Sequence, residues 1–485
     1  MAAESKPFGG LFGRRRAHEE HEHEDLREEH LMHDPRPREE MNRMVLESMM
    51  TTTRKYWIWV AILGLGVAIL LFGFWGNQIL TGMGVTGKRR PTFWTLYITT
   101  FVFWIGISHA GTFVSAILRV FKAEFRRPFT RAAELMTTFG LAAGALYPLI
   151  HLGRVWVFYW MVPYPNSRWL WPNFRSALVW DLLAITTYLL SSTIYLYLPL
   201  IPDLAMARDR TTGLRHKIYR AMALGWRGTE VEWYRLHKAI NIFAFAIIPV
   251  MFSVHTIVSW DFALTNVAMW HSTIFGPYFI IGAILSGVSA VVMILFVLRS
   301  TMLHMDYFIR LEHFDALGKL VLIFSMAWAY FFFNEFILTY YGGDMAEKTV
   351  LWSHMFGDRA WIWWTMIICN VAIPWLTLWN RRIRRTPLLM FIIMALINVG
   401  MYFERFTIIP MTLAEQRVPF LWGDYVPNVT DVAIVAGTFC LFIFLYMVMS
   451  RLIPLIPVWE VQEGQIAHSL TKVGKAELPS VTELE

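Results

Sequence analysis

Long apolar stretches alternate with short polar connections through most of the chain. Each stretch is about 20 residues or longer, which is enough for a helix to cross a hydrocarbon core of about 30 Å. Because a backbone exposed to lipid must satisfy its own hydrogen bonds, all of these stretches are expected to be helices. The pattern predicts ten spans, at about residues 56–80, 92–120, 132–162, 177–200, 236–259, 271–299, 316–341, 360–380, 386–409 and 430–453.

The fold class that this pattern predicts is an all-α integral membrane protein. Of the 485 residues, 56% are hydrophobic and 16% are aromatic, and the aromatic residues crowd the ends of the spans, as in the interfacial belts of membrane proteins. Spans 2 to 5 and spans 6 to 9 predict two four-helix bundles, with spans 1 and 10 as flanking helices.

The segments outside the spans predict three regions. Residues 1–50 form a charged tail rich in His and Glu, whose composition is expected to bury no core, and residues 51–455 form the membrane domain. Residues 456–485 form a C-terminal tail. The tail histidines are potential metal ligands, but solvated His/Glu tails without a metal are commoner, so no metal site is predicted; they are His18, His21, His23, His30 and His33.

The basic residues indicate the orientation in the membrane. Lys and Arg concentrate in the loops that follow spans 2, 4, 6 and 8, so these loops and both termini are expected to be cytoplasmic. The run KRR at residues 88–90 lies on the other side and is an exception. Because the basic residues stand beside apolar spans, the net charge of +7 reflects membrane orientation, and no nucleic-acid partner is expected.

The two cysteines limit the redox chemistry of this chain. Cys369 and Cys440 lie in separate spans, and the sequence has no CxxC or CxxCH motif. The chain therefore lacks the usual ligands of an iron–sulfur cluster or a covalently attached haem, and such centres are expected only in partner subunits.

Ionisable residues inside the predicted spans mark a candidate site near the outer surface. In the stretch LYPLIHLGRVW, Tyr147, His151 and Arg154 are spaced i, i+4 and i+7 on one helix face, and Asp181 lies one turn from the outer surface on the next span. Further residues are predicted at the same depth on other spans: His255, Asp261, Glu404 and Arg405.

This group of side chains suits proton-coupled chemistry on a lipophile with a polar head. A quinol needs acceptors for two hydroxyl protons as it is oxidised, and imidazole and carboxylate groups can supply them. The alternative is a structural role in ion pairs, between Arg154 and Asp181 or between Arg405 and Glu404. Among these residues His151 and Asp181, on adjacent spans, are the strongest candidates.

A second group is expected deeper in the membrane. His109 on span 2 and Glu335 on span 7 are candidates for a proton path toward the cytoplasm, which His237, Lys238 and Asn241 at the inner end of span 5 could continue. Hydrogen bonds between helices are the alternative for each of these residues.

Two other classes of membrane protein compete with a quinol-binding subunit. Membrane subunits that hold haem b often carry paired histidines 13 or 14 residues apart, whereas His237 and His255 are 18 apart and His109 and His151 differ in depth. A secondary transporter commonly breaks corresponding helices in two halves, whereas Pro148 and Pro249 fall in one half only.

Several motifs resemble the polysulfide-reductase membrane-subunit family of NrfD type. They are LYPLIHLGR, followed one helix later by VWDLLA, HAGTF on span 2 and YFERF on span 9. The resemblance covers residues 50 to 455, and the long charged tail and the ten spans are most similar to the C-type subunits (ActC) of alternative complex III.

The resemblance implies a bacterial inner-membrane subunit that binds menaquinol or ubiquinol near the periplasmic face. It implies His151 and Asp181 as quinol-site residues, with Arg405 and Asp261 as weaker matches. The implied partners are a periplasmic iron–sulfur protein, multihaem cytochrome c subunits and a second NrfD-like membrane subunit. A related F-type subunit shares the implied fold without the established quinol site and is the alternative within the family.

Overall fold

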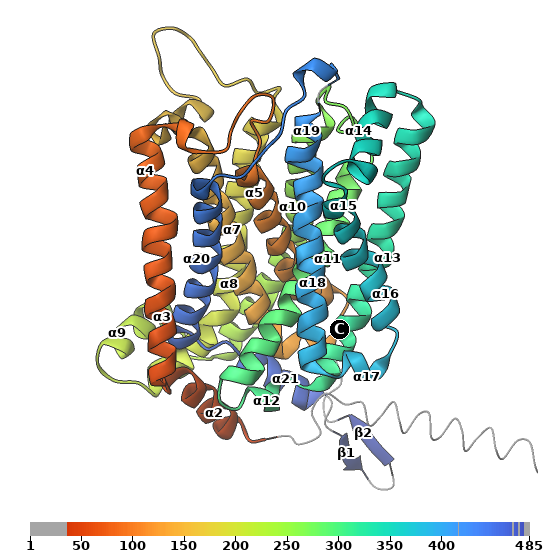
Figure 1. The fold of residues 1–485 in the computed structure, drawn as a ribbon. Helices are drawn as coiled ribbons and strands as arrows, with labels where there is room; N and C mark the ends of the chain where they lie inside the picture. Colours follow the sequence, from red (N-terminus) through yellow and green to blue (C-terminus); the bar gives the residue numbers. More distant parts are fainter. Residues whose placement is uncertain (1–35, 416, 468–469, 474–475, 480–485) are drawn as a thin grey trace, which may run out of the picture.

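Ten helical segments run between two ends of the molecule in the computed structural model, which describes residues 36–415, 417–467, 470–473 and 476–479 (Figure 1). We call the end with α4, α14 and α19 the upper end and the end with α2, α12 and α21 the lower end. In chain order, the segments are Arg54–Thr81, Leu96–Val120, Glu124–Leu152, Ala177–Asp209, Glu230–Ala263, Phe275–Thr301, Leu311–Gly342, Ala360–Thr377, Pro387–Ala414 and Val429–Leu452.

Five of these segments are single named helices for most or all of their length. They are α8 (Ala177–Asp209), α10 (Glu230–Ala263), α11 (Phe275–Thr301), α13 (Leu311–Gly342) and α20 (Val429–Leu452). A sixth segment begins with the 3₁₀ turn η4 (Glu124–Phe129) and continues as α7 (Thr130–Leu152). The other four contain short π-helical stretches: α3 (Arg54–Gly66), η1 (Val67–Gly73) and α4 (Phe74–Thr81); α5 (Leu96–Thr112), η3 (Phe113–Ile117) and α6 (Leu118–Val120); α15 (Ala360–Ile367), η6 (Ile368–Ala372) and α16 (Ile373–Thr377); and α18 (Pro387–Phe406), η7 (Thr407–Met411) and α19 (Thr412–Ala414).

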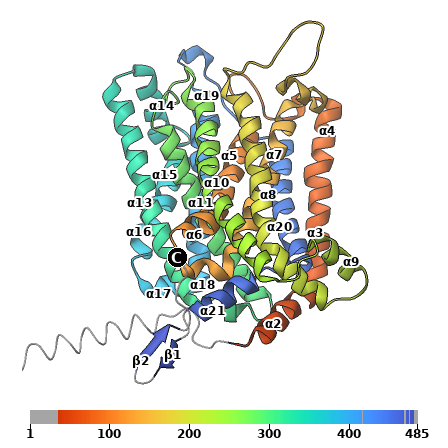
Figure 2. The same cartoon turned by 180° about the vertical axis from the view of Figure 1, so that it is seen from behind.

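The helices pack as two groups of four. α5, α7, α8 and α10 form the first bundle, and α11, α13, α15 and α18 form the second, with α5 packed along α11 where the bundles meet (Figures 1 and 2). α20 packs against α3, η1 and α7 at the side. This arrangement confirms the expected all-α fold of ten spans, two bundles and flanking helices.

Two glycines allow α5 to sit at the centre of this packing. A Cβ atom at Gly111 would lie 1.9 Å from Oγ1 of Thr137 on α7, and one at Gly287 on α11 would lie 2.4 Å from the Cβ of Ala110. Only glycine permits backbones to approach this closely. The close approach buries almost the whole of α5, including its polar residue His109.

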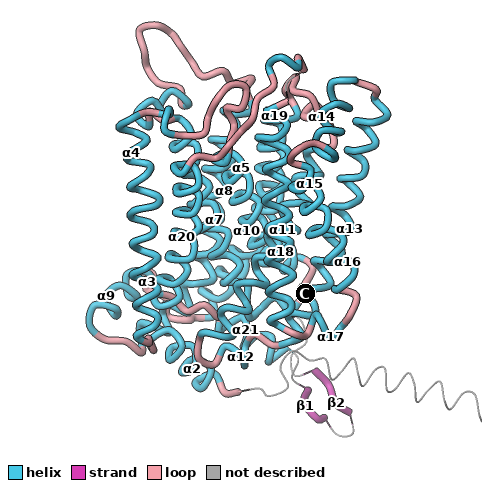
Figure 3. The backbone as a smooth tube through the Cα atoms, in the orientation of Figure 1, coloured by secondary structure: helices cyan, strands magenta, loops and turns pink. Residues whose placement is uncertain are grey.

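Short elements connect the spans at both ends (Figure 3). At the upper end these are η2 (Met83–Val85), η5 (Val155–Met161), α14 (Met345–Phe356) and η8 (Pro419–Leu421). At the lower end they are α2 (Arg38–Met50), α9 (Gly213–Met222), α12 (Met305–Phe308), α17 (Arg381–Arg384) and α21 (Val458–Ala467), followed by a hairpin of β1 (Leu470–Val473) and β2 (Ala476–Pro479).

The third span ends earlier than its hydropathy predicts. Gly153 adopts a φ of +72°, a conformation that glycine accepts readily, and it ends α7 at Leu152. Arg154 therefore lies beyond the helix, and the expected stripe of Tyr147, His151 and Arg154 on one helix face is wrong for its third member.

Parts of both expected tails are folded against the bundle. α2 buries Met41, Met44, Val45 and Met49, an apolar stripe at helical spacing within the segment expected to bury no core. At the other end, α21 is largely buried although residues 456–485 were expected to form a tail. The tail histidines at positions 18 to 33 lie outside the described residues.

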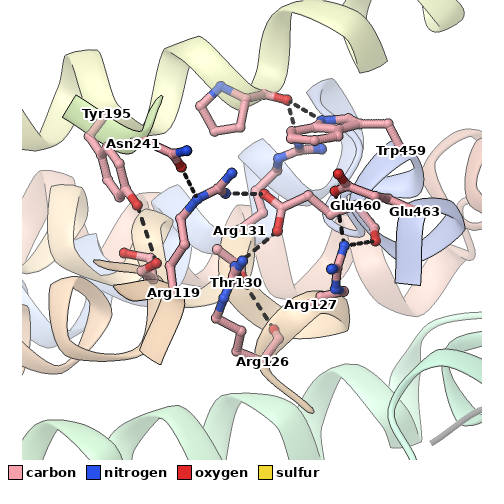
Figure 4. Close-up of polar contacts among 12 residues, drawn as sticks. Arg119, Arg126, Arg127, Thr130, Arg131, Tyr195, Asn241, Trp459, Glu460 and Glu463 are labelled. Carbon is pink, nitrogen blue, oxygen red and sulfur yellow. Dashed lines mark hydrogen bonds and ion pairs between the residues drawn. The ribbon is translucent and has the colours of Figure 1, made fainter. Parts of the chain in front are cut away.

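A cluster of arginines holds α21 at the lower end (Figure 4). The buried carboxylate of Glu460 lies 2.9 Å from Nη1 of Arg126 and 3.5 Å from Nη1 of Arg119. Nη1 of Arg127 donates to the backbone oxygen of Glu460, and the indole of Trp459 donates to the carbonyl of Pro199 on α8. The basic loop after span 2 thus binds the C-terminal segment by charge.

Candidate functional site

Two buried aspartates face each other at the upper end of the first bundle. Asp181 lies in the second turn of α8 and Asp261 near the end of α10, and these two helices pack along each other. Their carboxyl groups interact directly. No donor among the described residues reaches Oδ1 of either aspartate. A hydrogen bond between two carboxyl groups needs a proton on one of them, so the pair is suited to hold and pass a proton.

His151 lies at the same end, in the last turn of α7, and contacts a lysine from an upper loop. Nζ of Lys88 lies 2.8 Å from Nδ1 of His151 and 3.2 Å from the backbone oxygen of the same residue. Burial lowers the pKa of Lys88 to about 7, against the opposing effect of the negative charge of Asp431. The amine can therefore exchange a proton with the imidazole near neutral pH.

The exception at KRR is explained in part by this contact. Lys88 does not project into solvent beside the membrane but is mostly buried, with Nζ 5.2 Å from the centre of the Tyr97 ring. The preceding residue, Gly87, donates its backbone N–H to Oδ2 of Asp431 at 2.8 Å, which fixes the loop on α20. The sequence signal was the exception itself, because a lysine on the wrong side needs another reason to be there.

A chain of hydrogen bonds fixes the helix end that carries His151. Oγ1 of Thr438 on α20 lies 2.9 Å from the hydroxyl of Tyr147. The amide of Gln78 donates to the backbone oxygen of Ile150 at 2.8 Å and accepts a hydrogen bond from the hydroxyl of Tyr97 at 2.7 Å. Tyr147 is thus a buried anchor of α7, and Gln78 and Tyr97 are supporting residues that the sequence did not reveal.

Arg154 is placed apart from the aspartates. It is exposed, and it forms no ion pair with any residue that the structure describes. Asp181 interacts with Asp261 instead of with Arg154. The alternative of an ion pair between Arg154 and Asp181 is therefore wrong in this structure.

The two central histidines form a pair inside the first bundle. The rings of His109 and His255 have their centres 4.5 Å apart. Nδ1 of His109 lies 2.6 Å from the oxygen of Ile105, and Nε2 lies 2.9 Å from the oxygen of Met251. A neutral imidazole has only one N–H group, so both contacts are hydrogen bonds only when the ring is protonated.

Arg405 and Glu404 form the ion pair expected as the structural alternative. Nη1 of Arg405 lies 3.3 Å from Oε2 of Glu404, and its guanidinium lies 4.4 Å from the centre of the Phe279 ring. Oε1 of Glu404 accepts a hydrogen bond from the indole of Trp328 at 2.8 Å. Both charged side chains are fully enclosed, on the side of α18 that faces the first bundle's neighbour α11.

Glu335 belongs to a cavity in the second bundle. The cavity encloses about 540 Å³ of empty space, and its polar lining includes Glu335, Glu404 and His354 among aromatic side chains. Ser272 in an upper loop donates to Oε2 of Glu335 at 2.6 Å. Glu335 is therefore at the upper end, and its expected place on a path toward the cytoplasm is wrong.

The four residues expected to form a proton path are thus divided among three places. His109 is central, Glu335 and Glu404 share the upper cavity, and His237 lies near the lower end, with its ring centre 5.4 Å from that of Trp459. His354 was missed, because it lies on α14, outside the predicted spans.

The comparisons with known proteins agree with this fold. A family model described as polysulphide reductase, NrfD, matches residues 84–415, a range that includes Lys88, His151 and both aspartates. The putative C membrane subunit of the dimethyl sulfoxide reductase of Halobacterium salinarum is 27% identical over 412 residues, which are 82% of this chain and 87% of that protein. The C subunit of the selenate reductase of Mesobacillus selenatarsenatis is 24% identical over 306 residues, 61% of this chain and 68% of that protein. Because the family model covers most of the chain, this protein belongs to the NrfD polysulphide reductase family of membrane subunits.

Proposed function

We propose that this chain is the quinol-oxidising membrane subunit of a respiratory or photosynthetic electron-transfer complex. The observation that carries the proposal is the buried pair of Asp181 and Asp261, at the same end of the first bundle as His151 with Lys88. These groups offer two separate proton acceptors on packed helices, and the two unpartnered Oδ1 atoms fit the hydroxyl groups of a quinol.

The residues can account for both protons of the reaction. The ionised carboxylate of the aspartate pair accepts one hydroxyl proton, and the imidazole of His151 accepts the other and can pass it to the neutral amine of Lys88. As the two O–H bonds break, the quinol becomes a quinone and releases two electrons. These go to an iron–sulfur protein bound at the upper end, since this chain has no CxxC ligands for a redox centre.

The upper end then faces the periplasm, and the lower end, with α2 and α21, faces the cytoplasm of a bacterial cell. The basic loops at the lower end support this orientation. The names of the two relatives, membrane subunits of reductases, support a role that delivers electrons to a partner enzyme. In the assignment to a C-type subunit of alternative complex III, the electrons would continue to multihaem cytochrome c subunits, beside a second NrfD-like subunit.

Replacing His151 by Ala is expected to lower kcat for quinol oxidation by about 10²-fold, the usual size of a general-base contribution. Arg154→Gln is the matched control, because Arg154 is close in sequence but exposed. Turnover of decylubiquinol and of a menaquinol analogue by the purified complex measures both, after a gel has shown intact assembly. Unchanged turnover in His151→Ala, or an equal loss in Arg154→Gln, would move the reaction away from the end of α7.

We assign proton translocation, as a second and separable function, to the cavity of Glu335, Glu404 and His354. Buried carboxyl groups around an enclosed space can take up and release protons. Glu335→Gln is expected to lower the proton-to-electron ratio of the reconstituted complex while quinol oxidation continues. The ratio is measured with a pH-sensitive dye in proteoliposomes, and an unchanged ratio would contradict this role for the cavity.

A further inference from the structure

The connection between α8 and α10 at the lower end has an unusual charge. Residues 210–229 include five Lys or Arg residues and no Asp or Glu. Half of the connection is the helix α9, which the structure attaches to the side of the bundle (Figure 1). A segment with this composition attracts anionic partners.

One face of α9 is fixed to the protein. The hydroxyl of Tyr219 donates to the backbone oxygen of Leu452 at the end of α20 at 2.8 Å, and Arg215 contacts the sulfur of Met50 at the end of α2. The side chain of Tyr197 on α8 donates to the backbone oxygen of Met222. The helix is therefore held in one orientation, with its other face directed away from the bundle.

The outward face combines apolar and cationic side chains. Leu214 is 74% exposed and Ile218 is 44% exposed, one helical turn apart, and Leu224 just beyond the helix is 69% exposed. Lys217 and Arg220 are also exposed and follow one another on the adjacent stripe of the same helix. An apolar stripe beside a cationic stripe is the pattern of a helix that lies in a membrane interface.

The position of α9 agrees with such a location. Figures 1 and 2 show α9 at the height of the lower part of α3, above α2 and α12, and so at the level where the spans end. α3 itself has no buried residue, and its apolar side chains Trp57, Ile58 and Trp59 are exposed. The flank that carries α9 thus presents a hydrocarbon-facing surface above a cationic helix.

We propose that α9 is an anionic-phospholipid binding element, with Leu214, Ile218 and Leu224 among the acyl chains and Lys217 and Arg220 on the headgroup phosphates. The lipid is favoured over a protein partner by three features: the depth of α9, its apolar stripe and the absence of acidic residues from the whole connection. This inference is independent of the proposed quinol chemistry, since α9 lies at the opposite end of the molecule from Asp181.

Hydrogen–deuterium exchange of the full-length chain in nanodiscs tests the proposal. In nanodiscs with about 30% phosphatidylglycerol in phosphatidylcholine, the amides of residues 213–224 are expected to exchange about threefold more slowly than in phosphatidylcholine alone. The double variant Lys217→Gln and Arg220→Gln is expected to lose this difference. The control double variant Arg168→Gln and Arg175→Gln, in an exposed loop at the upper end, is expected to keep it.

Two results would overturn the proposal. Equal exchange of residues 213–224 in the two membranes would show that α9 does not select anionic lipid. Protection of these residues that depends on the partner subunits, and not on phosphatidylglycerol, would make the same face a protein interface.

Discussion

Asp181→Asn is expected to lower quinol oxidation by about 10²-fold or more, with the complex still assembled. Asn keeps the size of the side chain and can donate its amide to Asp261, so the packing of α8 on α10 survives. It cannot take up a proton, and its amide occupies the carboxylate that remains, so the pair loses the route by which a proton enters and leaves. kcat is therefore expected to fall more than the affinity for quinol.

The same substitution at Asp209 provides the control. Asp209 ends α8 at the lower end, and its side chain is exposed beside Arg208. Asp209→Asn is expected to leave quinol oxidation within about twofold of the wild type, because no proton acceptor of the site is changed. Turnover close to the wild type in Asp181→Asn would instead make the aspartate pair structural.

The shared proton has a further consequence for double variants. If Asp181 and Asp261 act as one unit, Asp261→Asn is expected to have a similar effect, and the double variant is expected to be no slower than the slower single variant. Losses that multiply in the double variant would show two independent groups. The measurement is the same turnover assay, carried out at saturating quinol.

The sequence predicted the parts of the fold that depend on composition along the chain. Ten spans follow from hydropathy alone, and the carboxyl groups of Asp181 and Asp261 are conspicuous because charged residues are rare inside spans. Their direct contact follows from the packing of α8 on α10, which no local pattern contains. The individual residues were thus identifiable, and their partnership was not.

The misplaced residues have specific physical causes. Arg154 was assigned to a helix that a single glycine conformation at Gly153 ends, and hydropathy does not register backbone dihedral angles. Lys88 was treated only as an orientation signal, although a long-range contact with His151 buries it. α21 was expected to be a tail because the binding of Glu460 depends on arginines more than 300 residues earlier in the chain.

Glu460→Ala is expected to cause the largest loss of stability, because it leaves the guanidinium groups of Arg126 and Arg119 buried without their carboxylate. Removing one partner of a buried ion pair typically costs about 3–5 kcal/mol. The side chains of Glu460 and Arg126 are 2% and 8% exposed, so water cannot replace the lost carboxylate. The free energy of unfolding of the purified chain in mixed detergent micelles measures this loss, and Glu463→Ala is the control. Glu463 contacts Arg127 with a side chain that is 46% exposed, and its loss is expected to cost about 0–1 kcal/mol.

The acid dependence of stability provides an independent check on the same residue. Burial acts to raise the pKa of Glu460, but the positive charges of Arg126 and Arg119 outweigh it and hold the pKa below its ordinary value of 4.5. The stabilisation is therefore fully present above pH 4.5 and is lost as the pH falls below it. Glu460→Ala is expected to remove this part of the acid dependence as well as the stability at neutral pH. A variant within about 1 kcal/mol of the wild type at neutral pH would instead mean that apolar contacts of α21, and not its charge, hold the C-terminal segment on the bundle.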